Sequence, residues 1–417
     1  MKPTITIIGA GISGLSAALH LYKHGFEVKI IEGSDRAGGR IKTDVVHGFR
    51  LDHGFQVLLT AYPEAKMILD YEKLNLKTFL PGATVLFDGG QFEIADPFRR
   101  PSALFATVFA PVGSLKDKIN TFLLKHKLLK KSVTNIFLQK QQSSAKQLVD
   151  YGFSTKMINR FYKPFFSGIF LENNLQTPNR MFDFVMKMFS EGDAAIPALG
   201  MEEIPKQLAA QLPNNVFLYN TKVIDIQDTT ILTIDNCEIK ADLIVLATEA
   251  NDLISKFKNN VERSHHSVTN VYFQADIAPS SKAVVILNAA ENRKFVTNIT
   301  VMTNISKDYA PANKVLISVS CNGILDFDDA KLAEIIKAEL KPWFKNHVDN
   351  WHHLKTYKIK YALPNLSVLS DDCTVSDVKI SEKLYCCGDY LMNGSINAAM
   401  KSGRLVADLI ISEHLQN

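Results

Sequence analysis

The sequence predicts an α/β fold in which a parallel sheet with flanking helices is interrupted by a second, α+β domain. Three observations support this prediction. Short apolar runs typical of buried strands lie far apart along the chain, at residues 4–8, 241–248 and 383–389. The first run is followed by helical spacing and then by another strand pattern, which makes a β-α-β unit. Glycine-containing turns follow the first and the last of these runs.

The β-α-β unit begins with a strand at residues 4–8, where the β-branched run is typical of a strand buried on both faces. Apolar residues at helical spacing predict a helix over residues 12–24, which Gly25 ends. Residues 27–32 predict a second strand, parallel to the first and reached by a right-handed crossover. Lys2 and the apolar residues after it also resemble the start of a signal peptide, but the glycine spacing that follows favours a strand.

The rest of the chain alternates between α and β patterns. Residues 60–190 are expected to be largely helical and are rich in aromatic residues. Strands are expected over 215–248 and over 268–320, and helices near 328–346 and over 395–414. We therefore expect one discontinuous domain built on the parallel sheet and one inserted domain with a helical part. The first comprises residues 1–60, 195–250 and 365–417, and the second comprises residues 61–194 and 251–364.

Composition excludes several classes of protein. The 417 residues are 46% hydrophobic and 22% charged, which is typical of a globular protein and not of a disordered or fibrous one. Lys and Arg number 47 and Asp and Glu number 43, so the net charge of +4 is too small to indicate a nucleic-acid partner. No run of 18 apolar residues occurs, so no membrane-spanning helix is expected.

The cysteine and histidine patterns predict neither disulfides nor a metal site. The five cysteines form no CxxC pair, which argues against a cysteine zinc site and suits a reducing compartment such as the cytoplasm. The pairs His265-His266 and His352-His353 have no third ligand at a sensible spacing, so we expect them in surface loops. The cysteines are Cys237, Cys321, Cys373, Cys386 and Cys387.

The turn after the first strand reads Gly9-x-Gly11-x-x-Gly14. Gly9 permits the tight turn, Gly11 lets the backbone approach a pyrophosphate, and Gly14 lets the helix pack on the strand. The amides of Ile12 and Ser13 then lie at the positive end of the helix, free to bind phosphate. Because the motif lies in a strand–turn–helix–strand context, it predicts a dinucleotide site rather than a tight turn without a ligand.

An acidic residue ends the second strand and narrows the choice of dinucleotide. Glu32, followed by Gly33, lies 18 residues after Gly14, where a carboxylate can bind the ribose hydroxyls. A carboxylate there disfavours a 2′-phosphate, so NADP is not expected. The chain has one GxGxxG motif and no CxxxxC pair, which disfavours disulfide reductases and NADPH-fed monooxygenases.

The loop after Glu32 is not expected of a plain NAD dehydrogenase. It contains Gly38 and Gly39, which let the backbone pass close to a flat or charged ligand. The guanidinium of Arg40, which follows them, has a fork of donors suited to a phosphate or a ring edge.

A third motif lies near the C-terminus, where a strand pattern ends at Gly388-Asp389 and a helix pattern starts near Ser395. Asp389 can accept hydrogen bonds from ribityl hydroxyls. The first helical turn, with Ile396 and Ala398, can stabilise negative charge on a reduced isoalloxazine near its C2 carbonyl. The three motifs together therefore predict FAD.

These motifs resemble the FAD-dependent amine-oxidase superfamily, which includes phytoene desaturase-like and protoporphyrinogen oxidase-like enzymes. The resemblance extends to residues 200–205, to Val223, to residues 241–248 with Thr248 at their end, and to residues 361–364. It implies that the parallel sheet belongs to a Rossmann-like FAD-binding domain and that the inserted domain binds substrate. It also implies that Val223 meets the adenine through its backbone.

In such enzymes the segment matching residues 52–56, with Gly54 and Phe55, lies beside the flavin ring. His53, Gln56 and Tyr361 are therefore our candidates for residues near the reacting face, although no catalytic acid or base is assigned. The cysteine context that binds flavin covalently in monoamine oxidases is absent. We therefore expect non-covalent FAD, with Cys386 and Cys387 as strand residues.

The resemblance implies an FAD-dependent oxidoreductase that passes a hydride from a C–H bond to flavin N5 and is reoxidised by O2 or another acceptor. Because the inserted segments are aromatic and apolar, we expect a hydrophobic substrate such as a polyene or a porphyrin-like precursor. The alternatives are an amine oxidase, a non-redox flavin-dependent isomerase and a non-catalytic FAD-binding protein. Tyr361 and Tyr390 only loosely match the aromatic pair of amine oxidases, which disfavours amine oxidation.

Residues 103–146 are a candidate contact with a membrane surface. Seven lysines and no acidic residue lie between Lys118 and Val149, interleaved with leucines, after an apolar run at 103–112. Such a basic amphipathic stretch can rest on an anionic bilayer, which would make a cytoplasmic protein membrane-associated. The alternative is an ordinary solvated helix face over the substrate domain. The sequence gives no indication of the oligomeric state.

Overall fold

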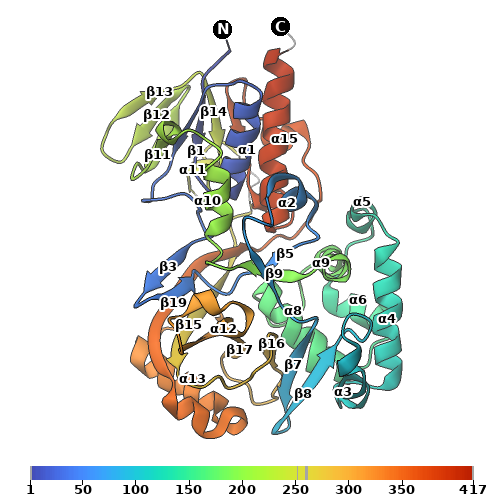
Figure 1. Ribbon diagram of the computed structural model, residues 1–417. Helices are drawn as coiled ribbons and strands as arrows, with labels where there is room; N and C mark the ends of the chain where they lie inside the picture. Colours follow the sequence, from blue (N-terminus) through green and yellow to red (C-terminus); the bar gives the residue numbers. More distant parts are fainter. Residues whose placement is uncertain (1, 251, 259–261, 416–417) are drawn as a thin grey trace.

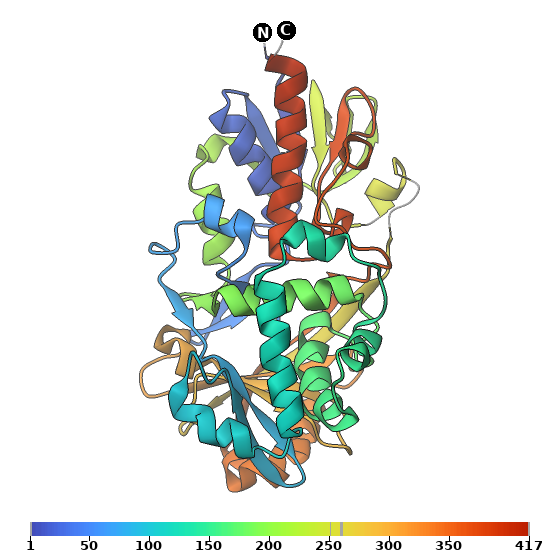
Figure 2. The same ribbon diagram turned by 90° about the vertical axis from the view of Figure 1, so that its right-hand side faces the viewer.

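The computed structural model describes residues 2–250, 252–258 and 262–415. A five-stranded parallel sheet lies at one end of the molecule and a seven-stranded mixed sheet at the other, with helices along one side (Figure 1 and Figure 2). Both described chain ends lie beside the parallel sheet. The expected α/β fold with a parallel sheet and a second, mixed unit is therefore confirmed.

The parallel sheet has the strand order β10-β2-β1-β14-β20, and its strands come from three distant segments of the chain. All neighbouring strands pair in parallel, and Ile7 of β1 lies between Ile30 of β2 and Val245 of β14. These central strands are buried on both faces, which explains their continuous apolar sequences. The strands are β1 Ile5–Ile8, β2 Val28–Ile31, β10 Phe217–Leu218, β14 Leu243–Leu246 and β20 Leu384–Cys386.

Two helices, α1 (Ile12–Lys23) and α15 (Ile396–Leu415), pack side by side on one face of this sheet (Figure 1). They approach so closely that a Cβ on Gly403 of α15 would lie 2.2 Å from the carbonyl oxygen of Ser13. The small residues of α15 thus permit the contact. A three-stranded antiparallel meander covers the other face through Ile226 and Ile231. Its strands are β11 Val223–Gln227, β12 Thr230–Thr233 and β13 Glu238–Lys240.

The mixed sheet has the strand order β19-β15-β18-β17-β16-β7-β8. Only β16 and β7 pair in parallel; the other neighbours are antiparallel. Helix α13 (Asp329–Phe344) packs its apolar face on this sheet. The strands are β7 Gly82–Phe87, β8 Gly90–Ala95, β15 His265–Ala275, β16 Val285–Asn288, β17 Val296–Val301, β18 Val315–Asn322 and β19 His352–Pro364.

The helical layer joins the two sheets along one side (Figure 2). Its elements are η1 Pro101–Ala103, α3 Leu104–Phe109, α4 Leu115–Leu129, α5 Val133–Phe137, α6 Ser144–Asp150, α7 Thr155–Met157, the π-helical η2 Ile158–Tyr162, α8 Lys163–Phe170 and α9 Asn179–Glu191. Short strands connect the halves: β3 Thr43–Val46 pairs with β4 Phe49–Asp52, and β9 Ala194–Pro197 lies between β5 Leu58–Leu59 and β6 Leu76–Thr78.

The remaining elements are short. They are α2 Pro63–Ile68, α10 Glu203–Ala209, η3 Asn214–Val216, α11 Asp252–Ser255, α12 Met302–Ile305, η4 Lys307–Tyr309, η5 Lys345–Asn350, α14 Val375–Val378 and η6 Asp389–Leu391. None of the helices in the described ranges is both long and apolar enough to cross a bilayer.

The expectation that residues 60–190 are largely helical is wrong for its first third. Strands β7 and β8 form a hairpin here, and its two-residue loop is Asp88-Gly89. Both loop residues have positive φ, 49° and 72°, as hairpin turns of the right twist require. The Asp-Gly pair between two β-rich runs is the sequence signal for this hairpin.

The histidine pairs do not lie in surface loops as expected. His265 and His266 begin β15, and His352 and His353 begin β19. Both pairs thus belong to the mixed sheet, and no cluster of metal-ligating side chains is found among the described residues. The division into an FAD-binding domain (1–60, 195–250, 365–417) and a substrate domain (61–194, 251–364) stays our proposal. Of its boundary residues, 1, 251 and 417 lie outside the described residues.

Candidate functional site

A cavity of about 1060 Å3 lies where the parallel sheet, the mixed sheet and the helical layer meet. Its lining begins at the β1–α1 turn and includes the ends of β2 and β20, the start of α15, and side chains of α8 and α9. Most residues named as cofactor ligands from the sequence line it. They are Gly9, Gly11, Ile12, Ser13, Glu32, Gly33, Gly38, Gly39, Arg40, Phe55, Gln56, Val223, Thr248, Gly388, Asp389, Ser395 and Ile396.

The three glycines of the β1–α1 turn have different surroundings. Gly9 has φ of 109°, and a Cβ there would lie 2.8 Å from the Ala247 carbonyl oxygen. A Cβ on Gly14 would lie 2.1 Å from the carbonyl oxygen of Gly9, so this glycine is required for the helix to pack on the turn and does not line the cavity. A Cβ on Gly11, in contrast, would meet nothing within 4 Å. The space beside Gly11 is therefore open, as a backbone that holds a pyrophosphate requires.

The first turn of α1 faces this open space without a competing anion. Gly11 is its N-cap residue, no side chain caps the helix, and the first turn contains no acidic residue. The amide donors and the positive end of the helix dipole are thus available to a phosphate.

Glu32 is held in place at the end of β2. Its carboxylate accepts hydrogen bonds from the backbone amides of Ala10 (2.7 Å) and Ser34 (2.9 Å) and from the Ser34 hydroxyl (2.7 Å). These bonds join the carboxylate to the glycine turn. Val223, at the start of β11, lines the same cavity as Glu32.

The Gly38-Gly39-Arg40 loop lies directly on the first glycine turn. Gly38 forms a parallel bridge with Gly11, and a Cβ on Gly39 (φ 59°) would lie 3.2 Å from the Gly11 Cα. Arg40 Nη2 donates to Asp389 Oδ1 at 2.6 Å, and Nη1 donates to the Ala362 carbonyl at 3.3 Å. Two residues that the sequence assigned separately to the cofactor are therefore a charged pair, which fixes both at the junction of the chain's first and last segments.

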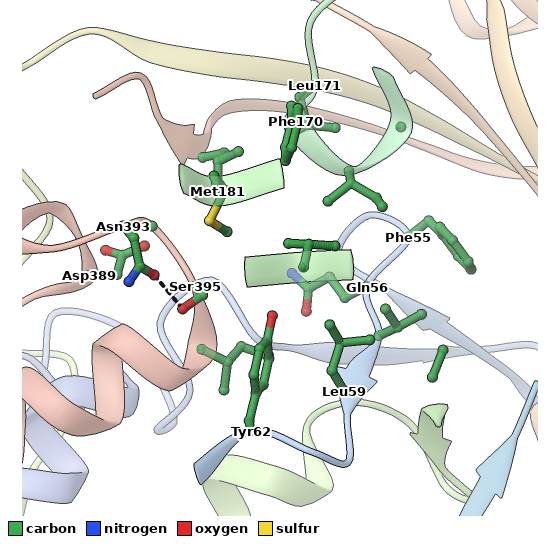
Figure 3. A pocket seen from close by; sticks show the side chains of 18 of the residues that line it. Phe55, Gln56, Leu59, Tyr62, Phe170, Leu171, Met181, Asp389, Asn393 and Ser395 are labelled. Carbon is green, nitrogen blue, oxygen red and sulfur yellow. Dashed lines mark hydrogen bonds between the residues drawn. The ribbon is translucent and has the colours of Figure 1, made fainter. Parts of the chain in front are cut away.

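The start of α15 is capped by its own side chains. Ser395 Oγ accepts from the Ala398 amide at 3.0 Å and donates to Asn393 Oδ1 at 2.7 Å (Figure 3). Ser395 and Ile396 line the cavity, whereas Ala398 is buried behind them. Cys386 lies in β20 and Cys387 follows it, and both are buried.

Two buried oxygens on the cavity wall have no hydrogen-bond partner among the described residues. One is Gln56 Oε1, since only the amide nitrogen of this side chain is used: it donates to the carbonyls of Arg40 (3.1 Å) and His53 (3.3 Å). The other is Thr248 Oγ1. Buried polar atoms are rarely left unpaired, so these atoms, the open Gly11 and the uncapped α1 fit a polar dinucleotide with a flavin ring.

Comparisons with known proteins agree with this geometry. A family model described as "Flavin containing amine oxidoreductase" matches residues 12–411. The chain belongs to this family. FAD is accordingly its cofactor, and the residues of the cleft fit it.

Individual relatives are more distant. A 1-hydroxycarotenoid 3,4-desaturase of Flavobacterium sp. (strain P99-3) is 28% identical over 193 residues, which are 44% of this chain and 36% of that protein. Protoporphyrinogen oxidase 2 of Arabidopsis thaliana is 25% identical over 166 residues, 39% of this chain and 32% of that protein. The matched segments thus span about a third of these relatives. An oxidoreductase structure from Methanosarcina mazei has a TM-score of 0.74 at 17% identity, covering 97% of this chain and 100% of that one, which shows a shared fold.

Two candidate residues lie elsewhere in this flavin-containing amine oxidoreductase. His53 Nε2 lies 3.2 Å from Asp44 Oδ2, and its ring packs on Tyr357 at 4.7 Å. Burial lowers the pKa of His53 despite this carboxylate. Tyr361 is 51% exposed and packs its ring on His265. Neither lines the cavity; Ala362 does, and adjacent strand residues point to opposite faces, so Tyr361 points away.

Two further residues of the motifs, Gly54 and Tyr390, lie outside the cavity lining and pack against other residues. Gly54 (φ 87°) packs against Ile359 of β19, where a Cβ would lie 3.0 Å from the Cδ1 of that isoleucine. Tyr390 is buried beside Gly388 and does not line the cavity, so neither tyrosine considered for an aromatic cage occupies such a position.

Beyond the predicted cofactor ligands, the cavity continues as a chamber with mainly apolar walls (Figure 3). Its inner walls come from β5, α8 and α9. Among the charged side chains near α3, Lys125 pairs with Asp96 and Arg99 pairs with Asp193, whereas Lys118 donates to the carbonyls of Val108 and Ala110. Of the chamber residues, only Phe55 is among those that the sequence assigned to the site. The chamber residues are Phe55, Leu59, Tyr62, Phe79, Phe161, Phe165, Phe170, Leu171, Met181, Val185 and Phe189.

Proposed function

We propose that this protein is an FAD-dependent dehydrogenase that removes hydrogen from a hydrophobic organic substrate. The observation that carries the proposal is the apolar chamber continuous with the flavin cleft. FAD, when bound, supplies the hydride acceptor. The chain's own residues hold the substrate by burying its apolar surface and exclude water from the reacting C–H bond.

The lining of the chamber also disfavours amine oxidation, the first alternative. A cationic amine needs a carboxylate or an aromatic cage, because a desolvated ammonium ion is otherwise costly. The carboxylates of Asp96 and Asp193 are already paired with lysine or arginine, and Tyr361 and Tyr390 lie outside the lining. The names of two relatives specify a hydroxycarotenoid and protoporphyrinogen as substrates, which supports dehydrogenation of a polyene or a porphyrin-like precursor.

The test is anaerobic mixing of the holoprotein with a polyene, a porphyrinogen and a polyamine in separate experiments, with the visible flavin absorption recorded. We expect bleaching with the polyene or the porphyrinogen and none with the polyamine. Bleaching by the polyamine alone would establish amine oxidation instead. If none bleaches the flavin, dithionite-reduced protein should be assayed for isomerisation, and activity there would replace our proposal.

We also propose that residues 103–146 rest on an anionic membrane surface, so that a hydrophobic substrate reaches the chamber from the bilayer. In α4, Leu115, Ile119 and Leu123 recur every four residues and are more than half exposed. Phe105 and Phe109 of α3 are exposed by 74% and 77%. Leu104, Val108, Lys118 and Phe122, from the same two helices, line the cavity.

This contact predicts binding to vesicles that contain phosphatidylserine. Each phenylalanine contributes about 1.5–3 kcal/mol when buried, so Phe105→Asp/Phe109→Asp should weaken partitioning at least about 100-fold in a sedimentation assay. The matched control is Val45→Asp/Ile277→Asp, which changes two residues exposed by 68% and 66% outside this face. Equal loss in both double variants, or no binding by the unsubstituted protein, would contradict the proposal.

A further inference from the structure

The phenol of Tyr62 lies in the wall of the chamber with its hydroxyl toward the cavity (Figure 3). The residue precedes α2 and is only 7% exposed. We propose that the Tyr62 hydroxyl binds a neutral oxygen of the substrate, so that the preferred substrate is an apolar molecule with one hydroxyl, ether or carbonyl group. This inference rests on the proposed function, because it concerns the substrate of the same site.

Tyr62 differs from most of the other buried tyrosines in that its hydroxyl has no partner among the described residues. Tyr162 is bonded to Thr121 (2.9 Å), Tyr309 donates to Asp52 (2.8 Å), and Tyr272 donates to the Asp52 carbonyl (3.0 Å). No described residue forms a hydrogen bond with the Tyr62 hydroxyl. The hydroxyl opens on the cavity, so a ligand bound there can supply the partner that the protein does not.

Tyr390 is the other buried tyrosine whose hydroxyl has no partner among the described residues, but it does not line the cavity. Tyr62 is therefore the phenol of this pair that a ligand can reach.

The Tyr62 ring is fixed before any ligand binds. It stacks on Phe184 of α9 with centroids 5.8 Å apart and an interplanar angle of 12°, and Phe184 packs in turn on Phe137. Two fully or nearly fully buried aromatic rings thus hold the phenol in one orientation. A donor held in this way loses little conformational entropy when it binds.

The surroundings of the hydroxyl favour a neutral acceptor over an ion. Tyr62 shares the cavity wall with the apolar Leu59 and Met181 and with the uncharged polar Gln56 and Ser395 (Figure 3). The Ser395 hydroxyl is already used in capping α15. Burial raises the pKa of Tyr62, so the phenol stays a neutral donor at physiological pH. An ionic group here would lose its hydration without gaining a counter-charge.

The experiment compares three probes that share one C15 hydrocarbon chain: farnesene, farnesol and farnesyl methyl ether. Their dissociation constants from the FAD-loaded protein are measured by equilibrium dialysis, which needs no turnover. Tyr62→Phe removes only the hydroxyl and keeps the ring on Phe184. We expect the preference for the alcohol and the ether over farnesene to fall about tenfold in this variant, with farnesene itself unaffected.

The control is Tyr390→Phe, which deletes a phenol that does not line the cavity and should leave all three constants unchanged. If all probes bind and Tyr62→Phe leaves the preference unchanged, the inference is overturned and the proposed function stands. If Tyr62→Phe instead shifts the flavin absorption spectrum or weakens FAD binding with the preference unchanged, Tyr62 faces the cofactor and the inference is likewise overturned. Failure of all three probes to bind contradicts both.

Discussion

Replacing Gly11 by alanine is expected to weaken FAD binding about 10- to 100-fold and to leave the fold intact. The backbone of Gly11 is extended, with φ of −73°, so alanine is tolerated there without strain. Its Cβ would enter open space beside the first turn of α1, where the diphosphate must approach. Intrusion of one methyl group into a closely packed contact costs about 1–3 kcal/mol, and each 1.4 kcal/mol is tenfold in affinity.

Gly14→Ala is the matched variant, because it adds the same methyl group three residues away. Its Cβ would lie 2.1 Å from the Gly9 carbonyl oxygen, inside the protein and not in the cleft. We expect this variant to lose FAD and also to unfold at lower urea concentration as apoprotein. Titration of both apoproteins with FAD and their urea unfolding curves separate the two effects. Unchanged FAD affinity in Gly11→Ala would contradict the placement of the diphosphate.

Asp52→Asn is expected to flatten the pH dependence of stability between pH 5 and pH 8. Asp52 is buried, and although Thr43 (2.6 Å), Met201 (2.9 Å) and Tyr309 (2.8 Å) donate hydrogen bonds to its carboxylate, burial raises its pKa from 3.8 to about 6. A carboxyl group with a raised pKa stabilises the fold while it is protonated. This contribution is complete below the unfolded pKa and is lost as the pH rises through 6.

As the pH rises, the raised pKa of Asp52 lowers the free energy of unfolding by about 3 kcal/mol in all. About 1.4 kcal/mol of this loss falls between pH 5 and pH 8. Asparagine has the same shape and no charge to bury. The unfolding free energy of Asp52→Asn relative to the unsubstituted protein should therefore rise by about that amount over this interval, as measured by urea unfolding in saturating FAD. A difference that stays constant with pH would show that Asp52 does not titrate there.

The segment from Asp52 to Gln56 shows which part of the candidate site could be predicted from the sequence. Asp52 begins the segment placed beside the flavin ring by resemblance, yet its side chain does not line the cavity. The carboxylate accepts a hydrogen bond from Tyr309, and the backbone carbonyl accepts one from Tyr272. Gln56, four residues later, does line the cavity. The segment was therefore predictable, but which of its side chains faces the ligand was not, because a turn at Gly54 reorients the chain.

The aromatic residues of the inserted region present the same difficulty. Phe166 and Phe182 are fully buried core residues, whereas Phe165 and Phe189 line the cavity. All four are phenylalanines in helices α8 and α9, so residue type and helical spacing do not distinguish them. Only the packing of α8 against α9 and the mixed sheet decides which rings form the core and which form the wall of the chamber.

The sequence by itself determined the FAD cofactor and the local features that fit it. The glycine turn, Glu32 and the start of α15 are local features, since each depends on backbone conformation and hydrogen bonds within a few residues, and residue type records these directly. The tertiary structure decided the rest: the pairing of Arg40 with Asp389, the outward position of Tyr361 and the unpartnered hydroxyl of Tyr62. These depend on contacts between segments up to hundreds of residues apart, and no local pattern encodes which faces of those segments meet.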